Sequence, residues 1–190
     1  LAAIANATGE TEAIQLTAEQ VVTLGQGGVN VGITVTDDAG NVTTKAWGDV
    51  FTLDTQAPND PTVELIGGDR LITADEAVNP GVISVKAEKD AQVDVVLTNK
   101  DESTKKVTLD PIANATGDPE AIQLTAEQVV TLGQGGVNVA ITVTDDAGNV
   151  TTKAWADVFT LDTQKPNDPT VDVIGGDRLI TADEAVNPGV

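Results

Sequence analysis

Apolar and polar residues alternate with a period of two along several short segments of the chain. The alternation is clearest over residues 137–144, where four Val and Ile side chains are separated by small or polar residues, and it recurs over residues 83–87 and 93–97. A period of two places successive side chains on opposite faces, as in a half-buried β-strand. A further segment carries Trp155, Phe159 and Leu161, which supply large core side chains to a last strand.

Turn and cap residues separate these segments. Asp145-Asp146-Ala147-Gly148-Asn149 lies between two strand segments and is typical of a hairpin turn. One short helix is expected in each repeat, because Thr125 and Gln128 form a capping-box sequence and Gly133 is a suitable end. About seven short strands per repeat of 108 residues indicate an all-β fold, an immunoglobulin-like antiparallel β-sandwich.

The chain repeats itself at an offset of 108 residues. Residues 1–82 align with residues 109–190 without a gap, and nine of the 82 pairs differ. The segment 54–61 holds two prolines and is echoed at 162–169, so we predict that the repeats are joined there. Residues 54–161 then form one complete repeat, residues 1–53 the C-terminal part of one repeat, and residues 162–190 the N-terminal part of the next. We do not expect either partial repeat to fold alone.

The amino-acid composition excludes several kinds of functional site and partner. The chain has 30 acidic and 10 basic residues, a net charge of −20, and no His, Cys, Met or Tyr. Catalytic His or Cys, disulfides and soft-ligand metal sites are therefore excluded. The negative charge argues against nucleic acid and anionic membrane as partners, and no apolar run is long enough for membrane insertion.

Several motifs carry a resemblance to a known family. Leu132-Gly133, the strand segment 137–144, the turn 145–149 and Asp162-Thr163-Gln164-Lys165-Pro166 resemble bacterial immunoglobulin-like (BIg) repeats. Such repeats form the stalks of giant repeats-in-toxin (RTX) type and biofilm-associated adhesins of Gram-negative bacteria. The resemblance implies an extender at the extracellular cell surface, exported by type I secretion and stiffened by calcium at domain junctions. A distal ligand would be bound by other domains of the full protein.

The residues themselves are also compatible with Ca²⁺, which takes six to eight oxygen ligands. At the pole where the chain enters the complete repeat, we expect the linker acids to approach the hairpin turn. The candidates there are Asp54, Asp60, Asp145, Asp146 and Asn149, with Asp37 and Asp38 as turn residues of the first repeat and Glu88 and Asp90 as further candidates. At the opposite pole the candidates are Asp75, Glu76, Asp101, Glu102, Asp162 and Asp168, whereas Asp69 is a candidate without an assigned pole.

Each cluster also has a simpler interpretation. The turn at Asp145 can be explained by local hydrogen bonding of Asp and Asn, and Asp75-Glu76 can be a solvated loop. Asp101-Glu102 precedes Lys105-Lys106 and fits a surface turn of mixed charge. The acidity as a whole can serve solubility.

Three classes of function remain to be compared. The first is a structural spacer of a surface adhesin, whose partners are neighbouring repeats of the same chain. The second is an adhesin domain that itself binds a glycan or surface ligand, which four aromatic residues support poorly. The third is an enzyme that uses paired carboxylates, and turn-borne acids without a deep cleft argue against it. We therefore predict a non-enzymatic spacer.

Overall fold

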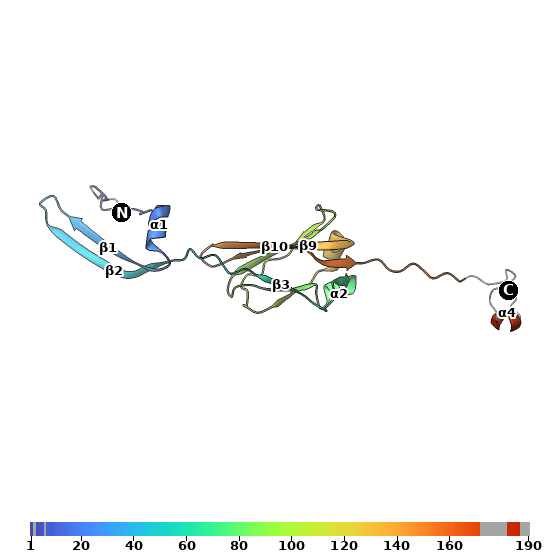
Figure 1. Ribbon diagram of the computed structural model, residues 1–190. Coiled ribbons are helices and arrows are strands. Elements are labelled where there is room, and N and C mark those ends of the chain that lie inside the picture. The colour runs from blue at the N-terminus through green and yellow to red at the C-terminus, as the bar shows by residue number, and fades with distance from the viewer. Residues whose placement is uncertain (2, 6, 172–181, 187–190) are drawn as a thin grey trace.

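The computed structural model describes residues 1, 3–5, 7–171 and 182–186, and its elements follow one another along an elongated molecule (Figure 1). A helix and a two-stranded hairpin of the first repeat come first, and the complete repeat lies in the middle. An extended segment follows it up to residue 171, and α4 (Ala182–Val186) is the last described element. No helix in the described part of the chain has the length and apolar character needed to cross a membrane.

Two sheets build the complete repeat. One has the order β4–β10–β9–β6–β7 and the other the order β3–β5–β8. All neighbouring strands are antiparallel except β4 and β10, which are parallel. The bounds are β3 Thr62–Leu65, β4 Leu71–Thr73, β5 Ile83–Lys86, β6 Gln92–Asn99, β7 Lys106–Thr108, β8 Glu120–Ile122, β9 Gly135–Thr144 and β10 Val150–Asp162. The predicted all-β sandwich is confirmed.

The first strand of the repeat is divided between the two sheets. β3 pairs with β5 in one sheet, and after Gly67 and Gly68 the chain continues as β4 beside β10 in the other. Both glycines have positive φ angles, 94° and 89°, which side-chain-bearing residues rarely adopt. This division raises the number of strands from the expected seven to eight.

The core lies between the two sheets and follows the alternation seen in the sequence. In β9, Val137, Val139, Ile141 and Val143 are buried, whereas the residues between them are partly exposed. β6 shows the same alternation, which continues to a polar residue, Asn99. Phe159 of β10 is among the largest fully buried side chains.

The complete repeat contains two short helices, one more than expected. The predicted helix forms as α3 (Ala126–Leu132), with the Thr125 and Gln128 capping box in place and Gly133 at its end. The expectation of one short helix per repeat was wrong, however, because α2 (Ala74–Val78) precedes β5. The Thr73 side chain accepts a hydrogen bond from the Glu76 amide, and the Glu76 side chain accepts one from the Thr73 amide. This second capping box is local enough to start a helix in a segment expected to be a loop.

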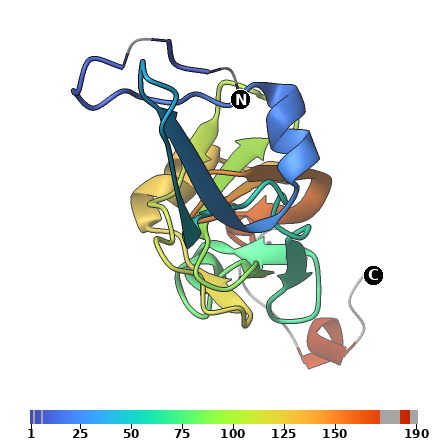
Figure 2. The ribbon, with the colours of Figure 1, turned by 90° about the vertical axis from the view of Figure 1, so that its left-hand side faces the viewer.

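Among its described residues, the first repeat forms the same helix and hairpin, and no second sheet. α1 (Ala18–Leu24) has the capping box of α3, and β1 (Gly27–Thr36) pairs with β2 (Val42–Leu53). The irregularity between Trp47 and Phe51 in the register of β1 and β2 matches the one between Trp155 and Phe159 in β9 and β10. Figure 2 views the molecule from the end that carries the first repeat, with α1 and the hairpin in front of the sandwich.

Candidate functional site

The linker between the first and the complete repeat starts at a clamp made by Gln26. The Gln26 side-chain amide donates to Asp54 Oδ1 over 2.8 Å, and its oxygen accepts from the Thr55 backbone N–H over 2.8 Å. Gln134 makes the same two bonds, to Asp162 and from Thr163, at the end of the complete repeat. The repeat therefore fixes the exit of its last strand with its own glutamine.

The following part of the linker is bonded to the complete repeat. Asn149 Nδ2 donates to the Asp54 carbonyl over 3.3 Å, and Thr151 Oγ1 donates to the Pro58 carbonyl over 2.6 Å. Lys153 forms an ion pair with Asp60, in which both side chains are largely exposed. The linker is thus held to β10 as well as to the clamp.

The loop between β5 and β6 holds the linker from another side. Glu88 Oε2 accepts from Asn59 N and Nδ2, over 3.0 and 3.3 Å. A polar hollow of about 140 Å³ lies at this point and is lined by Gln26, Asp54, Gln56, Ala57, Asn59 and Glu88. It brings together side chains from both repeats and the linker. The hollow is the candidate junction site.

The oxygen atoms available at the junction site are of the chemical types that a hard cation such as Ca²⁺ prefers. Asp54 and Glu88 supply carboxylates, and Gln26, Gln56 and Asn59 supply amide oxygens. The carboxylates already accept hydrogen bonds from Gln26 and Asn59, which compensate their charge in part. In the part of the chain that the structure describes, no three acidic side chains lie close enough together to hold a metal ion. A cation at the junction would therefore draw on amide and backbone oxygens as well.

The hairpin turn next to the junction uses its first aspartate locally. Asp145 accepts from Asn149 N over 2.8 Å and from Asn149 Nδ2 over 2.9 Å. These bonds, the side-chain amide bond first, hold the pKa of Asp145 below its usual value because they favour the ionised carboxylate. Asp37 and Asn41 repeat the arrangement in the first repeat. Asp145 therefore makes the turn hydrogen bonds that the simpler interpretation expects.

The other candidates near this pole are more dispersed. Asp146 and Asp38 are exposed at the tips of their turns. Asp90 lies beside Lys89, with 3.7 Å between the charged atoms. The structure therefore joins Asp54, Asn149 and Glu88 around the linker, while Asp60 faces Lys153.

At the opposite pole, the candidate acids also have local partners. Glu76 accepts from the Thr73 backbone N–H and hydroxyl, over 2.9 and 2.8 Å, and both bonds lower its pKa. Asp69 accepts from the Leu71 amide over 3.1 Å. Asp162 accepts from the Gln134 side chain and lies opposite Thr73 where β10 pairs with β4.

The remaining acids of that pole do not join this group. Asp75 is exposed in the first turn of α2, and Asp168 is exposed in the extended segment. Glu102 pairs with Lys105 over 2.7 Å, in agreement with a surface turn of mixed charge.

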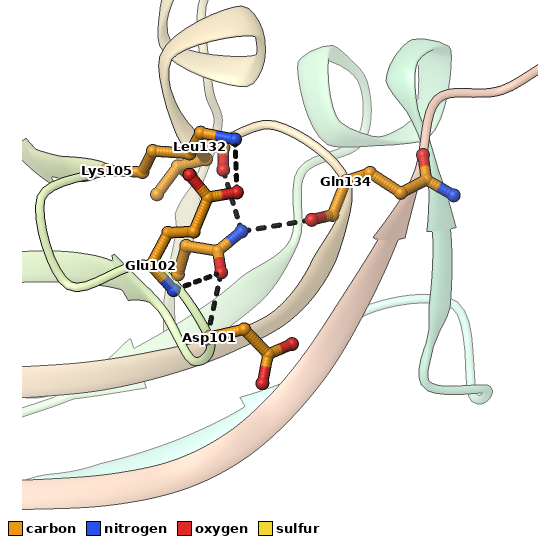
Figure 3. Close-up of polar contacts among 6 residues, drawn as sticks. Asp101, Glu102, Lys105, Leu132 and Gln134 are labelled. Atoms are coloured by element: carbon orange, nitrogen blue, oxygen red, sulfur yellow. Dashed lines mark hydrogen bonds and ion pairs between the residues drawn. The ribbon is translucent and has the colours of Figure 1, made fainter.

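Sequence reasoning missed two side chains that organise the poles. Gln26 gave no signal beyond its recurrence as Gln134, because its partners are 28 residues further along the chain or more. Asn99 did give a signal, since it continues the buried positions of β6. Its amide donates to the Leu132 and Gln134 carbonyls, and its oxygen accepts from the Asp101 and Glu102 amides (Figure 3).

Comparison with known proteins yields structural likenesses only. No protein-family model and no curated protein matches the chain. One similar solved structure is a Ca²⁺-stabilised adhesin with which an Antarctic bacterium binds ice, at 24% identity, 84% coverage of this chain and a TM-score of 0.39. Another is a 1.5-MDa bacterial ice-binding adhesin, at 23% identity, 73% coverage and a TM-score of 0.36. The matches span 38% and 43% of those chains. A likeness at this distance does not extend to ligands.

Proposed function

We propose that this chain is a spacer of a bacterial cell-surface adhesin, in which near-identical sandwiches are set in line to carry a distal binding domain away from the cell. The observation that carries the proposal is the linker, which is hydrogen-bonded to the repeat before it and to the repeat after it. Bonds on both sides restrict the angle between neighbours, so that reach grows with the number of repeats. No catalytic step is part of this role.

Calcium at the junction site is the second part of the proposal. Asp54 and Glu88 approach one polar hollow from the linker and from the complete repeat, and amide oxygens fill out the oxygen set. A divalent cation there would offset the repulsion between two carboxylates and oppose bending. Because ligation free energy adds to folding free energy, the junction would be more stable outside the cell, where calcium is abundant.

Distance measurements between spin labels test the spacer role. Ala46 and Ala154 are exposed and occupy equivalent positions of β2 and β10, and the chain has no native cysteine, so a label on each reports one joint. We expect a narrow distance distribution that broadens when Gln26→Ala removes the clamp. Gln134→Ala is the matched control, because it removes the same clamp from the other linker. A broad distribution in the unmodified joint, with and without calcium, would contradict the spacer role.

Charge-neutral variants test the calcium part separately. Asp54→Asn and Glu88→Gln keep hydrogen-bond acceptors but remove both carboxylates of the hollow. We expect millimolar Ca²⁺ to raise the melting temperature of the parent chain over that in chelator, and the double variant to lose this rise. Glu102→Gln, far from the junction, should keep it. An unchanged melting temperature in the parent chain would remove calcium and leave the spacer role to the distance measurements.

A further inference from the structure

The two linkers of the chain differ at one position of the junction site. Four residues that line the hollow of the first joint, Gln26, Asp54, Gln56 and Asn59, recur unchanged one period later as Gln134, Asp162, Gln164 and Asn167. Ala57, which also lines the hollow, recurs as Lys165. The second linker therefore carries a basic side chain at the position where the first has a methyl group.

This difference is unlike the others between the two copies. Seven of the nine differing pairs keep the formal charge, and the pair Ala2/Asp110 adds an acid outside the linkers. The pair Ala57/Lys165 alone adds a base. In copies that are otherwise almost the same, the single added base thus falls at a position that borders the junction site.

Local hydrogen bonds place this position in the same way in both linkers. Asp54 Oδ1 accepts from the Gln26 side chain over 2.8 Å and from the backbone N–H two residues further along over 3.1 Å. Asp162 Oδ1 accepts the same two bonds, over 3.0 and 3.2 Å. Ala57 and Lys165 are the next residues in their linkers. A lysine at position 57 would start from the wall of the hollow that Asp54 also lines.

The hollow of the first joint is negatively charged. Among the described residues, its lining holds the carboxylates of Asp54 and Glu88 and no basic side chain. Lys153 also contacts this linker, but its ammonium group pairs with Asp60. Two carboxylates that share a site favour a cation between them, and this cation can be a metal ion or the ammonium group of a side chain.

We propose that position 57, together with its copy 165, determines whether a joint between repeats depends on calcium. With alanine, as in the first linker, the carboxylates of the hollow are balanced by a divalent cation. With lysine, an ammonium group on a flexible stem balances one carboxylate and repels a second cation. The inference rests on the calcium part of the proposed function and extends it to an array that contains joints of both kinds.

Calcium titration of the full chain by calorimetry tests the proposal. Ala57→Lys gives the first joint the residue of the second linker, and it should weaken Ca²⁺ binding at least about tenfold because the ammonium group opposes another cation. Ala57→Met is the matched control, since it adds a long side chain without a charge, and it should bind Ca²⁺ as the parent chain does. Lys165→Ala changes only the other linker and should also leave the binding unchanged.

Melting in the presence of a chelator measures the effect of the lysine without the metal. Ala57 is exposed, so both variants should fold, as circular dichroism can verify. Ala57→Lys should melt about 2–4 °C above Ala57→Met, because only the charged side chain offsets the two carboxylates. This difference should disappear when Asp54→Asn and Glu88→Gln are added to both variants.

The outcomes separate this inference from the proposed function. Calcium binding by Ala57→Lys that is as tight as that of the parent chain would overturn the inference and leave the calcium part of the proposed function standing. Equal melting of Ala57→Lys and Ala57→Met in chelator would do the same. A parent chain that binds no calcium would contradict both.

Discussion

Truncation of one isoleucine in each copy separates what the two contexts contribute to stability. Ile141 lies in β9, the middle strand of the five-stranded sheet, and is 0% exposed. Ile33 occupies the same position in β1 and is 44% exposed. The paired variants Ile141→Ala and Ile33→Ala therefore make the same chemical change in nearly the same local sequence.

The expected magnitudes follow from burial. Removing the outer carbons of a buried isoleucine at about 0.8 kcal/mol each loses about 2.4 kcal/mol of transfer free energy. The cavity left between β6 and β10 raises the destabilisation by Ile141→Ala to about 3–4 kcal/mol. Ile33→Ala leaves no closed cavity and should cost the hairpin below about 1 kcal/mol. It should not change the unfolding free energy of the complete repeat.

Urea unfolding followed by tryptophan fluorescence measures the unfolding free energy of the complete repeat in each variant. The chain has two tryptophans, so Trp47→Phe leaves Trp155 of β10 as the reporter of the complete repeat. In this background Ile141→Ala should shift the unfolding midpoint strongly, and Ile33→Ala should not shift it. Equal shifts would refute the argument, because they would mean that the hairpin of the first repeat and the complete repeat unfold as one cooperative unit.

Three further perturbations follow from contacts within the complete repeat. Thr125→Ala removes the helix cap of α3 and should cost about 1 kcal/mol in the same urea assay, whereas Thr17→Ala in the first repeat should leave the Trp155 signal unchanged. Asn99→Leu leaves buried carbonyls without their donor and should cost about 2–3 kcal/mol by the same assay, and a neutral result would contradict the role of this amide. Asn149→Ala should raise the pKa of Asp145 toward its ordinary value of 3.8, as measured by carboxyl NMR titration, because it removes the main bond to the carboxylate. Since the folded pKa is lowered, this contribution to stability is present above the ordinary pKa and is lost as pH falls through the folded value, so the stability difference between parent and variant should shrink in acid.

The sequence carried enough information for the sandwich and for most of its elements. Strand alternation placed Ile141 and its neighbours on the buried face, and the capping box placed α3. The same rule applied to Thr73 and Glu76 also predicts α2. The loop interpretation of this segment was wrong because it rested on the charge of the segment and not on its capping sequence.

The junction could be predicted only in outline. The linker acids and the hairpin turn were expected at one pole, and Asn149 does contact Asp54 across 95 residues of sequence. The hydrogen-bond partners of individual carboxylates could not be deduced from the sequence. They depend on which donors the folded chain brings within hydrogen-bond distance of each carboxylate. Lys153 meets Asp60 and Asn59 meets Glu88 in the folded repeat, and neither pairing has a local sequence signature.

The two copies of the repeat separate what the sequence determines by itself from what the tertiary structure decides. α1 and α3 share one capping box, and the two hairpins share their turn bonds, register and bulge, because these features depend on residues near one another in the chain. Burial does not follow in the same way: Leu24 is 47% exposed and Leu132 is 0% exposed. A side chain becomes part of a core only when distant strands cover it, and in this chain residues 54–108 cover one copy and leave the other open.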